Sequence, residues 1–388
     1  MKNAPSNIAA SIRQRLLNRA RENEENFNSL LTRYGIERLL YRIGISSQAS
    51  HFCLKGAHLF AAWTGELHRP TKDVDFLGYG SPDPEDVANR ISKILSETEN
   101  ADGTNDGLDF NIESIHASEI REEVEYGGVR VKLTAELANA RINLQIDVGF
   151  GDAVTPAPIE LTLPTLLEDV SLPSPILNSY PQATAIAEKT EAMTSLGIAN
   201  SRLKDFYDIW TMSRTFSLDS SEVIEAIIQT FQRRKTKIEL EPMGLTNEFW
   251  SDKSVQLRWR AFAKKNISDK GQNFAFDTMV EELRTFLLPL LLSAFEGRVC
   301  TKQWNPKSQI WIPENQSARN TVEVTDKITV NQSDFFDQLF SGGSVVHSEY
   351  WITKQGKRHN PTCRYYKKTA GGFISSKLEG LPCSICGG

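Results

Sequence analysis

Three features of the sequence predict a mixed α/β (α+β) protein that contains a core with a mixed sheet, a helical domain and a small C-terminal module. Residues 51 to about 165 alternate strand and helix patterns, and residues 183–296 follow helical periodicity. The last fifty residues hold three of the five cysteines. A chain of 388 residues exceeds what one core usually organises, so we expect several domains. The expected parts are N-terminal helices at 1–50, the core at 51–170, the helical domain at 171–300, a linker at 301–340 and the module at 341–388. Short strands are the alternative to a linker at 304–330.

The composition is typical of a soluble globular protein, with 40% hydrophobic and 24% charged residues. With a net charge of −5, the protein as a whole does not attract nucleic acid electrostatically. Any nucleic-acid binding must therefore come from local basic patches on its surface. Near the N-terminus, Ile8, Ile12 and Leu16 form one stripe of an amphipathic helix rich in arginine, which does not fit a signal peptide. The apolar stretch at 286–295 is too short to cross a bilayer. We therefore expect a cytoplasmic protein with no membrane contact.

The first candidate site element is a glycine turn between a strand and a helix. The apolar run at 52–54 predicts a strand, Lys55, Gly56 and Ala57 follow it, and a helix is expected to start at His58. A glycine at such a turn lets the backbone approach a ligand closely, and the free N–H groups of a helix start favour a phosphate.

The second element is a pair of aspartates in the run Thr-Lys-Asp-Val-Asp-Phe at 71–76. Positions i and i+2 of a strand point to the same face, so the carboxylates of Asp73 and Asp75 are expected side by side. Hard oxygen ligands of this kind suit Mg²⁺. The alternative is a solvated strand end or turn.

A third carboxylate comes from the alternating run at 142–148, which projects Asn143, Gln145 and Asp147 from one face of a strand. Two aspartates on one strand and a third on a neighbour, beside a glycine turn, match the requirements of two-metal phosphoryl transfer. The proline-rich segment at 155–181 then predicts a crossing between layers.

Two predicted helices follow. The helix at 184–196 carries Lys189 between glutamates, which is typical of a surface ion pair. In the helix at 202–210 an apolar stripe is buried, and Asp205 and Asp208 share another face. Those aspartates form a solvated acidic face or an ion pair with Arg202 or Lys204, or Asp205 holds Lys189 or a substrate group. A basic run at 233–237 ends a further predicted helix, where it complements the helix dipole or faces RNA backbone.

The tail carries a separate metal-ligand pattern. His359 and Cys363 are followed, after 19 intervening residues, by Cys383 and Cys386. This Cys₃His set predicts a tetrahedral Zn²⁺ site in a zinc-ribbon-like module, with a disulfide as the alternative. Cys53 and Cys300 are expected to be free thiols.

The tail is also basic. From residue 347 onward, seven lysines and arginines outnumber two glutamates, and aromatic residues lie between them. Cations beside aromatic rings suit RNA, although the aromatics can equally form the core of the module.

The motifs together resemble the AbiEii/AbiGii toxin family of nucleotidyltransferases, which are similar to DNA polymerase β. The resemblance spans roughly the first 300 residues in five blocks, at 54–60, 69–76, 144–152, 187–193 and 202–210. The family usually has a second Gly or Ser after the motif glycine, where this chain has Ala57. Phosphate binding at that turn is therefore expected to rest on backbone groups.

The resemblance implies a toxin of a toxin–antitoxin or phage-defence system that transfers a nucleotide from an NTP. Asp73, Asp75 and Asp147 would hold Mg²⁺ or Mn²⁺, and Lys189 would contact the triphosphate with the support of Asp205. The nucleotide would also meet Lys55, Gly56, Ala57, Arg69, Lys204 and Asp208. The acceptor is expected to be RNA, such as a tRNA 3′ end, and a cognate antitoxin is implied. The alternatives are nucleotidylation of a protein or of a small molecule such as an antibiotic, and a catalytically idle binding protein that uses its zinc module.

Overall fold

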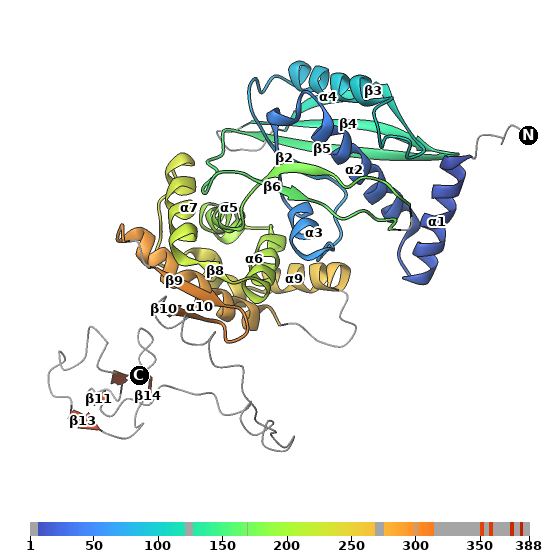
Figure 1. Ribbon diagram of the computed structural model, residues 1–388. Coiled ribbons are helices and arrows are strands. Elements are labelled where there is room, and N and C mark those ends of the chain that lie inside the picture. The colour runs from blue at the N-terminus through green and yellow to red at the C-terminus, as the bar shows by residue number, and fades with distance from the viewer. Residues whose placement is uncertain are drawn as a thin grey trace, which may run out of the picture. The chain divides into compact units, whose positions relative to one another are not determined.

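The chain divides into two compact units, residues 1–321 and 322–388, in the computed structural model (Figure 1). The structure describes residues 7–120, 127–168, 170–267, 275–298 and 301–313, together with the short strands of the second unit. Those strands form a four-stranded sheet in the order β13-β11-β12-β14. Their bounds are β11 Tyr350–Ile352, β12 Lys357–His359, β13 Phe373–Ser375 and β14 Leu381–Pro382.

The centre of the first unit is a mixed seven-stranded sheet in the order β3-β4-β5-β2-β1-β7-β6. β2 runs parallel to β5 and β1 runs parallel to β7, whereas the other neighbours are antiparallel. The mixed sheet expected from the sequence is confirmed. The strand bounds are β1 Phe52–Lys55, β2 Val74–Gly78, β3 Leu108–Ile120, β4 Gly128–Leu137, β5 Ala140–Phe150, β6 Ile159–Thr162 and β7 Ile176–Ser179.

Helices from the first hundred residues pack on this sheet: α2 against β5 and β7, and α4 against β3 and β4. Side chains of Asn7, Asn26 and Asp83 cap the first turns of α1, α2 and α4, which supplies acceptors for otherwise unpaired N–H groups. The bounds are α1 Ile8–Glu22, α2 Phe27–Ile45, the 3₁₀ turn η1 Ala49–His51, α3 His58–Thr64 and α4 Pro84–Thr98.

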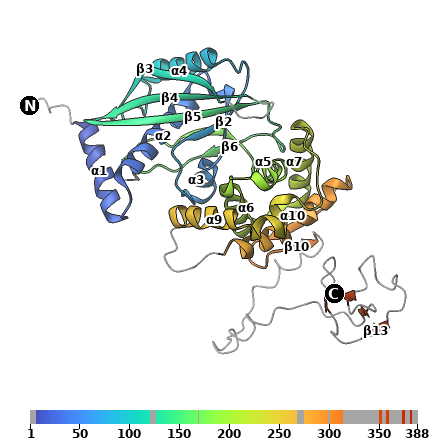
Figure 2. The ribbon, with the colours of Figure 1, turned by 180° about the vertical axis from the view of Figure 1, so that it is seen from behind.

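The second half of the first unit is helical, as expected, and α5 packs against α6 and α7 (Figure 2). A three-stranded sheet in the order β10-β9-β8 belongs to it. The bounds are α5 Gln182–Ser195, η2 Gly197–Ala199, α6 Leu203–Thr215, β8 Leu218–Asp219, α7 Ser220–Arg233, η3 Met243–Leu245, α8 Asn247–Ser251, α9 Lys253–Asn266, α10 Phe276–Phe295, β9 Lys302–Asn305 and β10 Ile310–Pro313.

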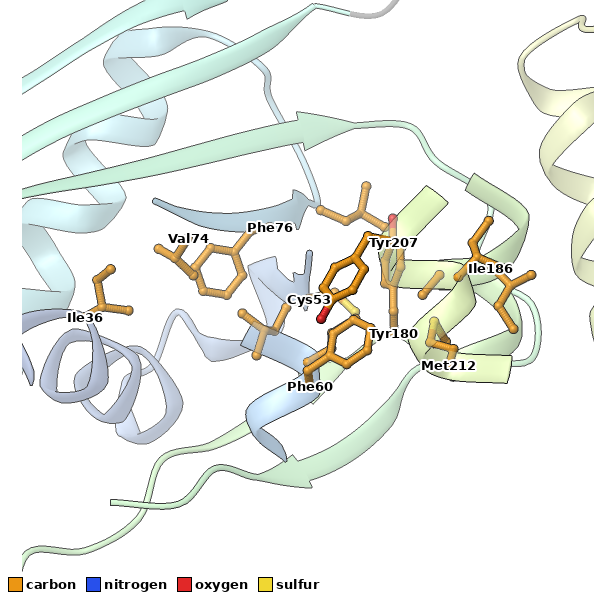
Figure 3. Close-up of a cluster of buried hydrophobic side chains, with 14 of the residues drawn as sticks. Ile36, Cys53, Phe60, Val74, Phe76, Tyr180, Ile186, Tyr207 and Met212 are labelled. Carbon is orange, nitrogen blue, oxygen red and sulfur yellow. The ribbon is translucent and has the colours of Figure 1, made fainter. Parts of the chain in front are cut away.

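One apolar core connects the sheet to the helices, as Figure 3 shows. Cys53 and Phe76 contribute to it from the strands, and Ile186 and Met212 contribute from α5 and α6. Cys53 is a buried free thiol, as the sequence predicted. Because the core is continuous, side chains at the strand ends are held at fixed positions relative to those on α5 and α6.

One expectation from the sequence needs correction. The proline-rich segment at 155–181 is not only a crossing, because it contributes β6 and β7 to the main sheet. The described start of the stretch for which a linker or short strands were expected holds strands: β9 pairs with β8 of the first unit, and β10 pairs with β9. In both places the backbone pairs with a strand far away in the chain.

The zinc prediction falls outside what the structure describes. Cys363, Cys383 and Cys386 do not belong to the described residues, and His359 is described only as part of β12. Cys300 lies outside them as well. In the described part of the chain, no helix is long and apolar enough to span a membrane.

Candidate functional site

The glycine turn lies directly against one of the predicted carboxylates. Gly56 follows β1 with a φ of 77°, and a Cβ atom at this position would lie 2.2 Å from Oδ2 of Asp75. Only glycine tolerates both conditions. Ala57 has an ordinary helical φ of −67° and gives no side-chain cap to α3. Alanine at position 57, in place of the family's usual Gly or Ser, therefore causes no backbone strain. The turn offers only backbone groups to a ligand.

The strand register brings the predicted carboxylates together. Asp75 of β2 is paired with Lys55 of β1 on one side and with Asp147 of β5 on the other. Side chains at paired positions of neighbouring strands project from the same face of the sheet. Asp73 was expected on the same strand as Asp75, but β2 begins at Val74, so Asp73 immediately precedes it.

Asp73 is held by its own loop. Its Oδ1 accepts a hydrogen bond of 2.9 Å from Thr71 Oγ1, and its backbone oxygen lies 3.2 Å from Nε2 of His58. Burial lowers the pKa of His58 to about 4, so this imidazole is neutral at pH 7 and donates to the Asp73 carbonyl. The contact ties the start of α3 to the loop in front of β2.

Asp75 is the carboxylate that remains available. The structure gives it no hydrogen bond or ion pair with any described residue. Burial, followed by the charge of Asp73, raises the pKa of Asp75, whereas Lys204 and Lys55 act in the opposite direction. An ionised carboxylate in this position is favoured by an added cation.

Asp147 already has a cation. Arg130 of β4 donates to it through Nε at 2.9 Å and Nη2 at 2.7 Å, and Gln145 Nε2 lies 3.2 Å from its Oδ1. Within the described ranges, no three His, Cys, Asp or Glu side chains converge closely enough to hold one metal ion. The donor chemistry of Asp73, Asp75 and Asp147 nevertheless fits Mg²⁺, because all three present hard carboxylate oxygens and Asp75 is paired with Asp147 in the register of β2 and β5.

A second group of charges lies where α5 meets α6. Lys189 Nζ is 3.0 Å from Asp205 Oδ1 and 2.7 Å from Asp208 Oδ2, and both aspartates are buried. The surface ion pair and the solvated acidic face considered from the sequence are therefore wrong. Burial lowers the pKa of Lys189, but the charges of Asp205 and Asp208 outweigh it and raise that pKa, so the amine stays protonated. Arg202 Nε, 2.8 Å from Asp205 Oδ2, adds a second cation.

Asp208 connects this group to the loop in front of β2. Its oxygens accept from Arg69 Nε at 2.7 Å and Nη2 at 2.9 Å, and His68 Nε2 lies 2.6 Å from Oδ1. Burial opposes ionisation, but Lys189 and Arg69 hold the pKa of Asp208 well below its usual range. The sequence analysis missed His68, because its partner is 140 positions away in the chain.

The candidate residues thus differ in their surroundings. Lys55 and the exposed Lys204 are close enough to Asp75 to influence it electrostatically. Asp208 has no exposed surface and fixes Arg69 and Lys189 through hydrogen bonds.

Lys55 belongs to another buried cluster that the sequence did not reveal. Its Nζ lies 2.6 Å from Asp152 Oδ2 and 3.7 Å from Glu188 Oε1. Arg234 also binds both carboxylates, at 3.0 and 2.9 Å, and it binds Glu191 at 2.8 Å. Three carboxylates thus share two cations. Burial raises the pKa of Glu188 to about 7. Burial lowers the pKa of Lys55, but the charges of Glu188 and Asp152 outweigh this effect and raise the pKa of Lys55 to about 12.

The basic run at 233–237 therefore does not present Arg234 to RNA. Arg234 caps α7, but its guanidinium points into this cluster. Tyr180, also missed from the sequence, lies with its hydroxyl 3.1 Å from Asp152 Oδ2.

Comparison with known protein families gives a match that covers more than half of the chain. The model of the AbiEii family, described as a nucleotidyl transferase toxin of a type IV toxin–antitoxin system, matches residues 38–282. No curated protein sequence matches the chain.

Two solved structures have a similar fold. MenT4, a nucleotidyltransferase toxin from Mycobacterium tuberculosis H37Rv, shares 16% identity, with 74% of this chain and 98% of that chain covered and a TM-score of 0.39. JHP933 from Helicobacter pylori shares 12% identity, with 76% and 96% covered and a TM-score of 0.38.

Proposed function

The chain belongs to the AbiEii nucleotidyltransferase toxin family, and from this premise we propose that it transfers a nucleotide from an NTP to an RNA acceptor with the help of Mg²⁺. The observation that supports this proposal most directly is the position of Asp75. It lies between Lys55 and Asp147 in the strand register, against the Gly56 turn, and no described residue pairs with its carboxylate. An unpaired carboxylate beside a cation and an open backbone turn suits a metal-bound triphosphate.

In this proposal Asp73, Asp75 and Asp147 hold Mg²⁺, with Mn²⁺ as a substitute. The bound ion would neutralise charge on the phosphates during transfer. Gly56 and Ala57 offer backbone groups to the phosphates.

The cations around the carboxylates would bind the rest of the nucleotide. Lys55, Lys204 and Arg69 add positive charge around the triphosphate. Lys189 would stabilise charge at the leaving group, with Asp205 and Asp208 as positioning residues, since both are buried beneath it.

The acceptor is proposed to be RNA, such as a tRNA 3′ end, because members of the family include RNA-modifying enzymes and the tail of this chain is basic. Such substrates place the reaction in the cytoplasm, where a cognate antitoxin would restrain it. The rival acceptors are a protein and a small molecule such as an antibiotic. The idle-protein alternative is opposed by the intact set of Asp73, Asp75 and Asp147.

The acceptor can be tested directly. We expect wild-type protein, incubated with each α-labelled NTP, Mg²⁺ and a cell extract divided into RNA, protein and small-molecule fractions, to label the RNA fraction. An Asp75→Asn control, run in parallel, should label none of them. Label confined to the protein or small-molecule fraction would contradict the RNA acceptor while leaving nucleotide transfer intact.

Lys189 and Asp205 are predicted to act as one unit. Lys189→Ala should lower the rate of transfer by about 100-fold, because a cation at the leaving group stabilises the transition state. Asp205→Ala should have a similar effect, and the double variant should be little worse than either single one. Single-turnover rates test this. Lys307→Ala, in the exposed β9–β10 turn, is the control and should leave the rate unchanged.

The spacing of His359, Cys363, Cys383 and Cys386 in the sequence is the basis for proposing that these residues bind one Zn²⁺ ion. Purified full-length protein is expected to contain about one equivalent of zinc, and Cys383→Ser should release it. Elemental analysis after dialysis measures both. Cys53→Ser, which changes a buried thiol outside the tail, should retain the metal. If wild-type protein contains no zinc, the zinc site is refuted, and the tail cysteines would form a disulfide or be free thiols.

A further inference from the structure

Helix α9 is strongly basic in an acidic protein. Its 14 residues include five cations, Lys253, Arg258, Arg260, Lys264 and Lys265, and no acidic residue, whereas the whole chain has a net charge of −5. We infer that α9 is the surface on which the phosphate backbone of the acceptor RNA lies. This inference rests on the proposed function and assigns the acceptor a binding surface outside the catalytic residues.

Three of the four exposed cations, together with one exposed leucine, follow one face of the helix. Lys253, Leu257, Arg260 and Lys264 are spaced by four, three and four positions, so they form a single stripe. With a rise of about 1.5 Å per residue, this stripe is about 16 Å long. All four side chains are exposed, and Leu257 is 64% accessible. The opposite face is buried through Val255 and Trp259.

The helix itself gains little from the cations of the stripe. Arg260 and Lys264 are like charges at i and i+4, an arrangement that destabilises a helix by a few tenths of a kcal/mol. Lys253 occupies the first turn, where the helix dipole favours an acidic residue, whereas Lys264 and Lys265 in the last turn complement that dipole. No described residue forms an ion pair with Lys253, Arg260 or Lys264, while Arg258 lies within electrostatic reach of Asp252. The positive charges of the stripe are therefore available to a partner from solution.

The packing of α9 fixes this helix beside the candidate site. The ring of Phe262, on the same helix face as Val255 and Trp259, lies 5.9 Å from that of Tyr207 on α6, and Tyr207 is stacked on His68 at 5.6 Å. His68 in turn contacts Asp208. Both ribbon views show α9 beside α6 and close to α3, the helix that follows the Gly56 turn (Figures 1 and 2). The stripe lies on the other face of α9, which is exposed, so this inference places the phosphates on the outer side of a helix that neighbours the site.

The test compares two full-length variants of equal net charge. One is Lys253→Gln/Arg260→Gln/Lys264→Gln on α9. The control, Arg21→Gln/Lys93→Gln/Lys307→Gln, removes three exposed cations from α1, α4 and the β9–β10 turn. Fluorescein-labelled bulk tRNA is titrated by anisotropy between 50 and 200 mM KCl.

We expect the α9 variant to bind tRNA at least about 10-fold more weakly than wild type. The slope of log K against log salt concentration should become less steep by about 2 to 3, because each phosphate contact that is lost means about one counterion fewer released on binding. The control should stay within about twofold of wild type. The affinity for a fluorescent ATP analogue should be equal in all three proteins, since the stripe lies outside the nucleotide site.

Several results would overturn the inference. Equal weakening in both variants would mean that only net charge matters. If wild type labels RNA but the α9 variant binds tRNA as tightly as wild type does, α9 is not the RNA-binding surface. The proposed transfer to RNA would still hold. If the α9 variant binds tRNA normally but loses an acidic protein partner captured by wild type, the surface belongs to that partner. Wild type that neither binds tRNA nor labels RNA would refute the RNA acceptor and this surface together.

Discussion

Replacing Asp75 with asparagine is expected to abolish nucleotide transfer. The amide keeps the shape of the side chain but loses the charge that would bind Mg²⁺. If the missing charge stabilisation is about 4 kcal/mol, the rate falls by about a thousandfold. Single-turnover labelling of RNA with saturating NTP measures the loss. Asp109→Asn, an exposed aspartate of β3, is the matched control and should keep the wild-type rate.

The same substitution is expected to make the protein more stable at neutral pH. Burial and the charge of Asp73 raise the pKa of Asp75, so the folded state binds a proton more tightly than the unfolded state does. Wild type therefore loses stability as the pH rises from the ordinary aspartate pKa through the raised one. Asp75→Asn avoids this loss, so its melting temperature should exceed that of wild type at pH 7 and converge with it at low pH.

Function and stability then move in opposite directions, which is typical of a functional residue and not of a structural one. Thermal melts at several pH values, run beside the transfer assay, separate the possibilities. A variant that is inactive and also less stable at pH 7 would mean that Asp75 supports the fold, and the assigned site would be wrong.

Asp208→Ala is expected to cause a large loss of stability. Asp208 has no exposed surface, and its two oxygens accept from Arg69, His68 and Lys189. Removing it leaves buried cations without their shared partner, which typically costs about 3 to 5 kcal/mol. Transfer should fall as well, because Arg69 and Lys189 would lose their positions.

Urea unfolding at pH 7 measures this effect. Asp208→Asn, which keeps one acceptor oxygen, should lose less stability than Asp208→Ala, and Asp109→Ala on the exposed face of β3 should lose almost none. A loss below about 1 kcal/mol for Asp208→Ala would show that water or a rearranged loop replaces the carboxylate, so that Asp208 would not be a positioning residue.

Local patterns in the sequence predicted much of the fold and part of the site. The alternation at 142–148 correctly placed Asp147 on the polar face of a strand, and that strand does lie beside the one with Asp75. The spacing of Asp205 and Asp208 correctly put both on one helix face, from which both reach Lys189. Patterns of this kind depend only on the period of a strand or helix.

The remaining features depend on contacts between distant parts of the chain. Arg69 meets Asp208 across 139 positions, and Arg234 meets Asp152 across 82. No periodicity encodes such pairs, because they exist only once the sheet and the helices have packed together. The boundary of β2 was missed for a related reason: Asp73 alternates like a strand residue, but the hydrogen bond from Thr71 holds it in a turn.

The pairing of Arg130 with Asp147 bears on the repulsion among the carboxylates of the site. Three aspartates gathered at the middle of a sheet repel each other. Here the neighbouring strand supplies the opposite charge from within the chain, through two hydrogen bonds. Part of the repulsion among these carboxylates is therefore relieved in the folded chain by one of its own arginines, before any ion or nucleotide binds.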